Sequence, residues 1–88
     1  MQEMWAAVLI IPRDKAGEVE SVLEKICERD PSFGYARYAN RLVVLDEDLN
    51  RLHRRAMWLY GRLGVKYFVA KALVEGGCVV GLEAVEKA

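Results

Sequence analysis

The sequence has few of the residues on which most catalytic and metal-binding sites depend. It contains one histidine, His53, and two cysteines, Cys27 and Cys78, in 88 residues. These three residues lack the short spacing of a zinc site, such as C-x2-C. The segment VEGGCVVG, at 74–81, has neither the GK[ST] of a phosphate-binding loop nor a G-x-G-x-x-G before a helix. We therefore expect a domain without catalytic machinery or cofactor; the alternative is an enzyme whose site is shared between subunits.

The chain also lacks threonine, and it has only one glutamine and two asparagines. This depletion of the thermolabile amide residues fits a thermophile protein. Its formal net charge is zero, so no overall field attracts nucleic acid or an anionic membrane. The apolar run at 4–11 is too short to cross a bilayer and lacks the basic start of a secretory signal. Two cysteines do not suggest a disulfide framework, so we expect reduced thiols and a cytoplasmic protein.

Apolar residues are abundant for so small a chain. They make up about 57% of it when glycine is counted and tyrosine is not, against a usual 45–50%. A chain of this length forms one domain, 1–88, and a small domain has proportionally more surface to cover. Self-association would hide the surplus, so we expect a homo-oligomer, most simply a dimer. The alternative is a core tightly filled with alanine and valine.

The first half of the chain predicts a strand, a helix and a hairpin. Residues 4–11 are continuously apolar and end at Pro12, which indicates a strand covered on both faces. Asp14 is a candidate cap for the following helix, which Pro31 terminates. The apolar face of this helix consists of Val19, Val22, Leu23, Ile26 and Cys27. Strands at about 33–38 and 41–46 follow, with Asn40 in the turn between them.

The second half predicts a helix and two more strands. Asp46 is a candidate cap for this helix, and Gly64 is suited to its end. Residues 65–74 and 78–85 read as strands joined by a turn at Gly76 and Gly77.

The order β-α-β-β-α-β predicts an α+β fold of the ferredoxin-like, split β-α-β kind, with an extra C-terminal edge strand. Two helices then cover one face of an antiparallel sheet, with strand order 2-3-1-4-5. A different α+β sandwich built from the same elements is the alternative. The element order resembles that of small regulatory and RNA-binding domains, an analogy of fold that does not decide function.

The segment RLHRRAMWLYGR, at 51–62, places a tryptophan among arginines. The predicted core stripe of this helix consists of Leu49, Leu52, Ala56, Leu59, Tyr60 and Leu63. Trp58 points about 140° away from the centre of that stripe. Arg54 and Arg62 lie four residues before and after Trp58, so their guanidinium groups can stack on the indole. A straight helix on a sheet leaves Trp58 exposed, or covered by something outside this chain.

Between Leu49 and Val74 the sequence has no acidic residue. Arginine binds phosphates bidentately, and tryptophan stacks on an unpaired base. The pattern predicts that RNA or another single strand binds to this helix, although no RNP-type motif accompanies it. Trp58 is the expected stacking platform. The expected phosphate contacts are Arg51, Arg54, Arg55, Arg62 and Lys66.

Other interpretations remain open. Trp58 could anchor a homodimer interface, because tryptophan and arginine are enriched at interface hot spots. The arginines could instead form ordinary surface pairs with Glu20, Glu24 or Glu28. The alternative function is a ligand-sensing regulatory module that dimerises through its sheet. Its candidate contacts on an exposed sheet face are Tyr35, Arg37, Tyr67 and Lys71.

Overall fold

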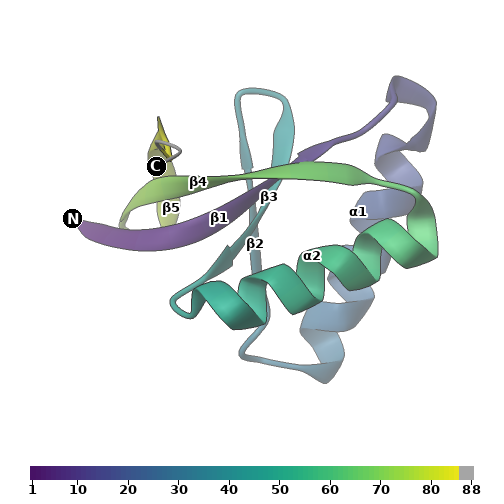
Figure 1. Ribbon diagram of the computed structural model, residues 1–88, viewed down its shortest axis with the longest axis horizontal. Coiled ribbons are helices and arrows are strands. Elements are labelled where there is room, and N and C mark those ends of the chain that lie inside the picture. The colour runs from purple at the N-terminus through teal and green to yellow at the C-terminus, as the bar shows by residue number, and fades with distance from the viewer. Residues whose placement is uncertain (86–88) are drawn as a thin grey trace.

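The computed structural model describes residues 1–85, which form two helices and one five-stranded antiparallel sheet (Figure 1). The strands are β1 (Gln2–Ile10), β2 (Gly34–Tyr38), β3 (Arg41–Asp46), β4 (Lys66–Glu75) and β5 (Cys78–Ala84). The helices are α1 (Ala16–Arg29), preceded by the 3-10 turn η1 (Arg13–Lys15), and α2 (Leu49–Leu63). The predicted elements are therefore present, and residues 86–88 of the predicted domain lie outside the described part.

The two predicted turns and the predicted end of α2 are confirmed. At each of them a glycine or asparagine adopts the left-handed backbone conformation. Gly64 ends α2 with φ 68°, and its N–H donates to the carbonyl of Tyr60. Asn40 has φ 66° in the β2–β3 turn, and Gly76 and Gly77 both have positive φ between β4 and β5. These signals are local, because glycine and asparagine adopt this conformation at little cost.

The predicted helix caps are wrong. Asp14 lies within η1, and α1 has no side-chain cap. Helix α2 is capped by Asp48, whose carboxylate accepts hydrogen bonds from the backbone N–H groups of Asn50 and Arg51. Asp46 is instead the last residue of β3, and its side chain is buried.

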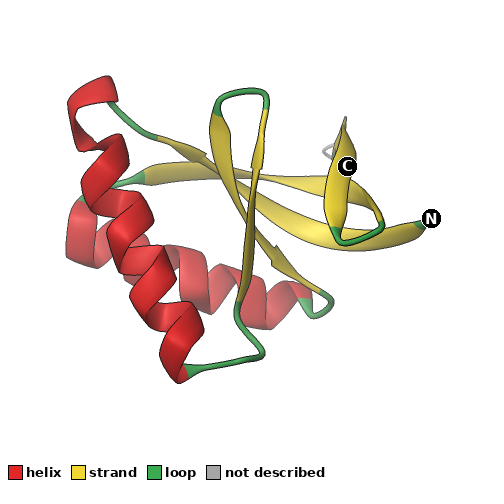
Figure 2. Cartoon of the chain, turned by 180° about the vertical axis from the view of Figure 1, so that it is seen from behind, coloured by secondary structure: helices red, strands yellow, loops and turns green. Residues whose placement is uncertain are grey.

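The sheet has the order β2-β3-β1-β4-β5, so the most apolar strand, β1, lies at its centre. Figure 2 shows both helices on the same side of the sheet, with the β4–β5 hairpin at the end away from them. The core between helices and sheet includes Leu23 of α1, Leu52 and Leu59 of α2, and Leu9 of β1. Tyr60, predicted in the core stripe, is half-exposed at the edge of α2. Within residues 1–85, neither helix is long and apolar enough to cross a membrane.

The centre of the sheet face that turns away from the helices is also buried. Its centre carries the small residues Ala6, Ala70 and Ala72, which are almost completely inaccessible. Val79 and Leu82 of β5 pack against this face. Strands β2 and β5 contact each other although they are opposite edges of the sheet. The sheet therefore coils back on itself, which small central side chains permit.

A register shift in the β4–β5 pairing accompanies this coiling. It lies between Leu73 and Val74 of β4. A bulge increases local twist and bends the strand pair, so it turns β5 toward the face opposite the helices. The open sheet face expected from a plain two-layer sandwich is therefore largely covered by the chain itself.

Candidate functional site

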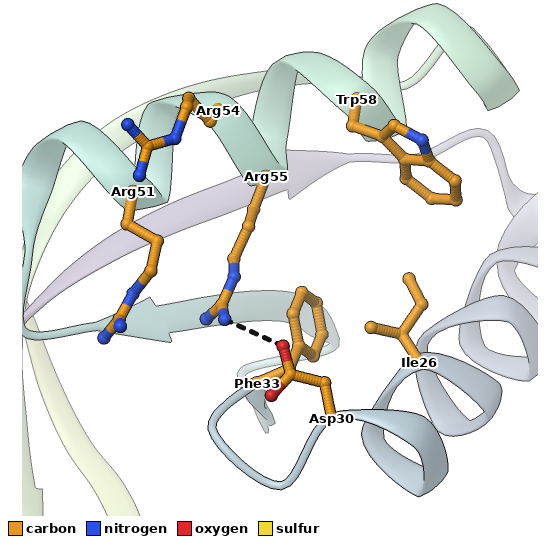
Figure 3. A pocket seen from close by; sticks show the side chains of 7 residues that line it. All are labelled: Ile26, Asp30, Phe33, Arg51, Arg54, Arg55 and Trp58. Atoms are coloured by element: carbon orange, nitrogen blue, oxygen red, sulfur yellow. Dashed lines mark hydrogen bonds and ion pairs between the residues drawn. The ribbon is translucent and has the colours of Figure 1, made fainter.

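Trp58 lies over the groove between the two helices, which we call the inter-helix groove. Its side chain leaves the flank of α2 that faces α1, and the indole points toward Ile26 of α1 (Figure 3). The residue remains 50% exposed. Trp58 therefore lies outside the sheet-facing stripe of α2 and partly covers α1. Half of its surface remains accessible to a partner.

A buried carboxylate at the end of β3 holds two of the predicted phosphate-binding arginines. The Asp46 side chain is 0% exposed. Arg51 donates to it from Nε and Nη2, both at 2.8 Å, and Arg55 donates from Nη1 at 3.0 Å. The backbone N–H of Asp48 adds a fourth hydrogen bond at 2.9 Å. This Asp46 cluster joins the end of β3 to the first two turns of α2.

Arg55 also connects α2 to the loop after α1. Its Nη2 lies 3.1 Å from Oδ2 of Asp30 and 3.0 Å from Oγ of Ser32. Its guanidinium carbon lies 5.2 Å from the centre of the Phe33 ring, a cation–π arrangement. Only 15% of the Arg55 side chain is exposed. Arg55 therefore stabilises the fold and has little capacity left for a phosphate.

The pKa of Asp46 reflects these contacts. Burial has the largest individual effect and raises the pKa, because a buried carboxylate loses its hydration. The hydrogen bonds from Arg51 and from the Asp48 backbone lower it, as do the positive charges of Arg51 and Arg55. Together they outweigh burial, so the net pKa lies below the usual aspartate value and the carboxylate is ionised at neutral pH.

The arginines of α2 do not pair with the acidic residues of α1, as one interpretation expected. Glu20 pairs with Arg37 of β2 instead. The pKa of Tyr35 on β2 is raised, first by burial and then by the negative charges of Glu24 and Glu20. Since these charges act on a residue of β2, both carboxylates lie on the β2 side of α1. The acidic flank of α1 thus faces away from the inter-helix groove.

Two pockets adjoin Trp58, and both are lined by Trp58 and Ile26. The first, the Phe33 pocket, has a volume of about 350 Å³ and is open to solvent. Its lining is Ile26, Asp30, Phe33, Arg51, Arg54, Arg55 and Trp58 (Figure 3). The second, the Arg62 pocket, has a volume of about 300 Å³. Its lining is Val22, Lys25, Ile26, Arg29, Trp58, Arg62 and Leu63. Both volumes are at the lower end of the range for small-ligand sites.

The Arg62 pocket contains two cations that the sequence prediction did not include, Lys25 and Arg29 of α1. They lie four residues apart, so they share one flank of the helix. The glutamates Glu20, Glu24 and Glu28 are also four residues apart and share the other flank. This separation of basic and acidic residues on two flanks of α1 is the sequence signal that could have identified Lys25 and Arg29. Within residues 1–85, Lys25, Arg29, Arg54 and Arg62 form no ion pair.

Two predictions about the basic residues are wrong. Lys66 pairs with Ile10 across β1 and β4, and strand alternation places both with Phe68 on the face opposite the helices. Lys66 is therefore not part of the inter-helix groove. The guanidinium group of Arg54 points away from the indole of Trp58 (Figure 3). In the described residues the cation–π pairs join Arg55 to Phe33 and Lys71 to Trp5, not an arginine to Trp58.

The contacts suggested for a ligand-sensing module do not lie on an open sheet face. Tyr35 and Tyr67 pack against the core on the helix side. Arg37 pairs with α1, and the Nζ of Lys71 lies 4.9 Å from the centre of the Trp5 ring on the same side. Tyr35 and Arg37 belong to β2, whereas Tyr67 and Lys71 belong to β4, and two other strands lie between β2 and β4, so the four residues do not form one site.

The single histidine, His53, lies beside a tyrosine of β4. Nδ1 of His53 lies 3.4 Å from the hydroxyl of Tyr67, and the two rings are tilted with centroids 6.3 Å apart. Among residues 1–85, no three His, Cys, Asp or Glu side chains form a group that could hold a metal ion. His53 therefore links α2 to β4 in this fold.

Comparison of the chain with protein-family models, with curated proteins and with solved structures finds no match. Function must therefore be argued from the geometry of the inter-helix groove itself.

Proposed function

We propose that the protein is a cytoplasmic, non-enzymatic binding domain whose inter-helix groove binds single-stranded nucleic acid, RNA foremost. The observation that supports this proposal is the half-exposed indole of Trp58 between two pockets with cations on both helices. Lys25 and Arg29 on α1 and Arg62 on α2 lack ion-pair partners within residues 1–85, so they can neutralise phosphates. An unpaired base can stack on the indole, whereas a base inside a duplex cannot reach it.

Trp58→Ala should weaken the binding of a short fluorescein-labelled RNA by about 5- to 150-fold, the 1–3 kcal/mol that one stacked base contributes. Fluorescence anisotropy measures this without relying on tryptophan emission. Met57→Ala is the matched control, because Met57 is also exposed but lies on the other flank of α2. Equal affinities for wild type and Trp58→Ala would count against the proposal, as would an equal loss in the control.

A second candidate is self-association, which rests on a different surface from the one predicted. Ile10 and Phe68 are both about half-exposed. They are diagonal neighbours on the face opposite the helices, because Val8 pairs with Phe68 and Ile10 with Lys66. This apolar pair, rather than Trp58, is the surface that we propose for a symmetric dimer.

Light scattering after gel filtration should then give twice the 10.0 kDa chain mass for the wild type at high micromolar concentration. Phe68→Glu should give the monomer mass, because two buried carboxylates would oppose each other across the interface. Trp58→Ala should leave the dimer intact. A monomeric wild type, or a dimer lost in Trp58→Ala and kept in Phe68→Glu, would contradict this assignment.

We also infer that the fold is a ferredoxin-like, split β-α-β arrangement with β5 added at its edge. The supporting features are the element order, the central position of β1 and both helices on one face. The covering of the opposite face by β5 is a departure from that plan.

A further inference from the structure

The two pockets beside Trp58 differ in chemistry. The Phe33 pocket has apolar and aromatic walls from Ile26, Phe33 and Trp58. Most of its charged groups are engaged, because Arg51 and Arg55 are bound to Asp46, and Asp30 accepts hydrogen bonds from Ser32 and Arg55. The exception in the lining is Arg54, which has no ion-pair partner within residues 1–85 and whose guanidinium group points away from Trp58 (Figure 3). A neutral, flat group fits this pocket better than an anion.

The Arg62 pocket has the opposite character. Lys25, Arg29 and Arg62 all line it, and no acidic residue is among its lining. Each of these cations is exposed and lacks an ion-pair partner within residues 1–85. Three positive charges on facing flanks of two helices repel one another, and a bound dianion would relieve that repulsion.

The indole of Trp58 is the boundary between the two pockets. Trp58 and Arg62 are about one helical turn apart, about 6 Å along α2, a separation that one nucleotide can span. We propose that a single nucleotide straddles Trp58, with its base in the Phe33 pocket against the indole and its phosphate in the Arg62 pocket. This assignment rests on the proposed function and specifies how the groove would divide its ligand.

The test compares adenosine, AMP and inorganic phosphate as ligands of the 15N-labelled protein at millimolar concentration. Adenosine should shift the Trp58 indole signal and the amides of Ser32 and Phe33. Inorganic phosphate should shift the amides of Arg29 and Arg62. AMP should shift both groups and bind at least about ten-fold more tightly than adenosine, because it adds charge-assisted hydrogen bonds.

Arg62→Gln should weaken AMP by about ten-fold and leave adenosine unchanged, whereas Lys66→Gln, on the other face, should affect neither. The division would be overturned if AMP and adenosine bound equally and shifted the same signals, or if no ligand produced shifts in the groove.

The outcomes also separate this inference from the proposed function. In one outcome RNA binding depends on Trp58, but AMP does not shift the signals of both pockets. This outcome would contradict only the assignment of separate base and phosphate pockets, and the proposed function would stand. The divided response without RNA binding would identify a free nucleoside monophosphate as the ligand. In that case the single-strand proposal fails and the two-pocket assignment stands.

Discussion

Asp46→Asn is expected to lower the free energy of unfolding by about 3 kcal/mol, because it removes the counter-charge of Arg51 and leaves the largely buried Arg55 with Asp30 alone. The carboxylate accepts four hydrogen bonds, three of them from Arg51 and Arg55. An asparagine keeps one acceptor but turns an N–H group toward these donors. Urea denaturation followed by far-ultraviolet circular dichroism measures the change.

Asp14→Asn is the matched control, because Asp14 is exposed in η1 and caps no helix. Its effect should stay within about 0.5 kcal/mol. If Asp46→Asn were as mild as this control, the Asp46 cluster would not stabilise the fold and Arg51 and Arg55 would be available to a ligand.

The pH dependence gives a second measurement of the same cluster. The folded-state pKa of Asp46 is lower than normal: burial raises it, but the Arg51 hydrogen bonds, the Asp48 backbone and both arginine charges outweigh burial. A depressed folded-state pKa adds stability above the unfolded-state value of about 3.9, and that stability is lost as the pH falls through the folded-state pKa. The difference between wild type and Asp46→Asn should therefore be constant near neutral pH and shrink below about pH 4. A difference that grows on acidification would contradict this sign.

Features of the fold that depend on a single residue or on its neighbours in the sequence could be predicted. Gly64, Asn40 and Gly76 mark real turns because the conformational preference belongs to the residue itself. The choice between Asp46 and Asp48 as helix cap could not be made this way. It depends on where β3 stops, and β3 continues to Asp46 because this strand pairs with β1 up to Trp5.

The sequence pattern also did not show how the sheet face opposite the helices is covered. Strand β1 is apolar on both faces, which correctly predicted burial on both. The pattern did not indicate that β5 and β2, rather than another subunit, provide the second cover. Part of the apolar surplus is therefore buried within the chain itself.

The position of Trp58 on its helix could be predicted from the sequence, whereas the contacts of the neighbouring arginines depend on the three-dimensional fold. Helical periodicity correctly placed Trp58 away from the core stripe. It could not show that Asp30 and Asp46, from two other elements, would reach Arg55 and Arg51. The pairing of β1 with β4 shows that Lys66 lies on the face opposite the helices, outside the groove.

The largest effect on binding is expected from removing the three cations of the Arg62 pocket together. On a strand of several nucleotides the three cations would contact successive phosphates, the one in the Arg62 pocket and its neighbours along the strand. Each such contact contributes about 0.7 to the slope of log affinity against log salt concentration, so Lys25→Gln/Arg29→Gln/Arg62→Gln should lower that slope by about 2. At about 50 mM salt this corresponds to a loss of affinity on the order of several hundred-fold, and the difference should vanish toward about 1 M salt. Anisotropy titrations of a short labelled RNA at several salt concentrations measure both quantities.

The matched control for this triple variant is Arg13→Gln/Arg41→Gln/Lys66→Gln, which changes the net charge by the same amount at exposed positions outside the inter-helix groove. Its slope should remain that of the wild type, because the released counterions come from phosphates bound in the groove rather than from the overall charge. Lys66 is the informative member, since the sequence alone assigned it to the binding surface and strand alternation places it on the opposite face. Equal slopes for the two triple variants would show that any RNA affinity follows net charge, and the groove would then have no special part in it.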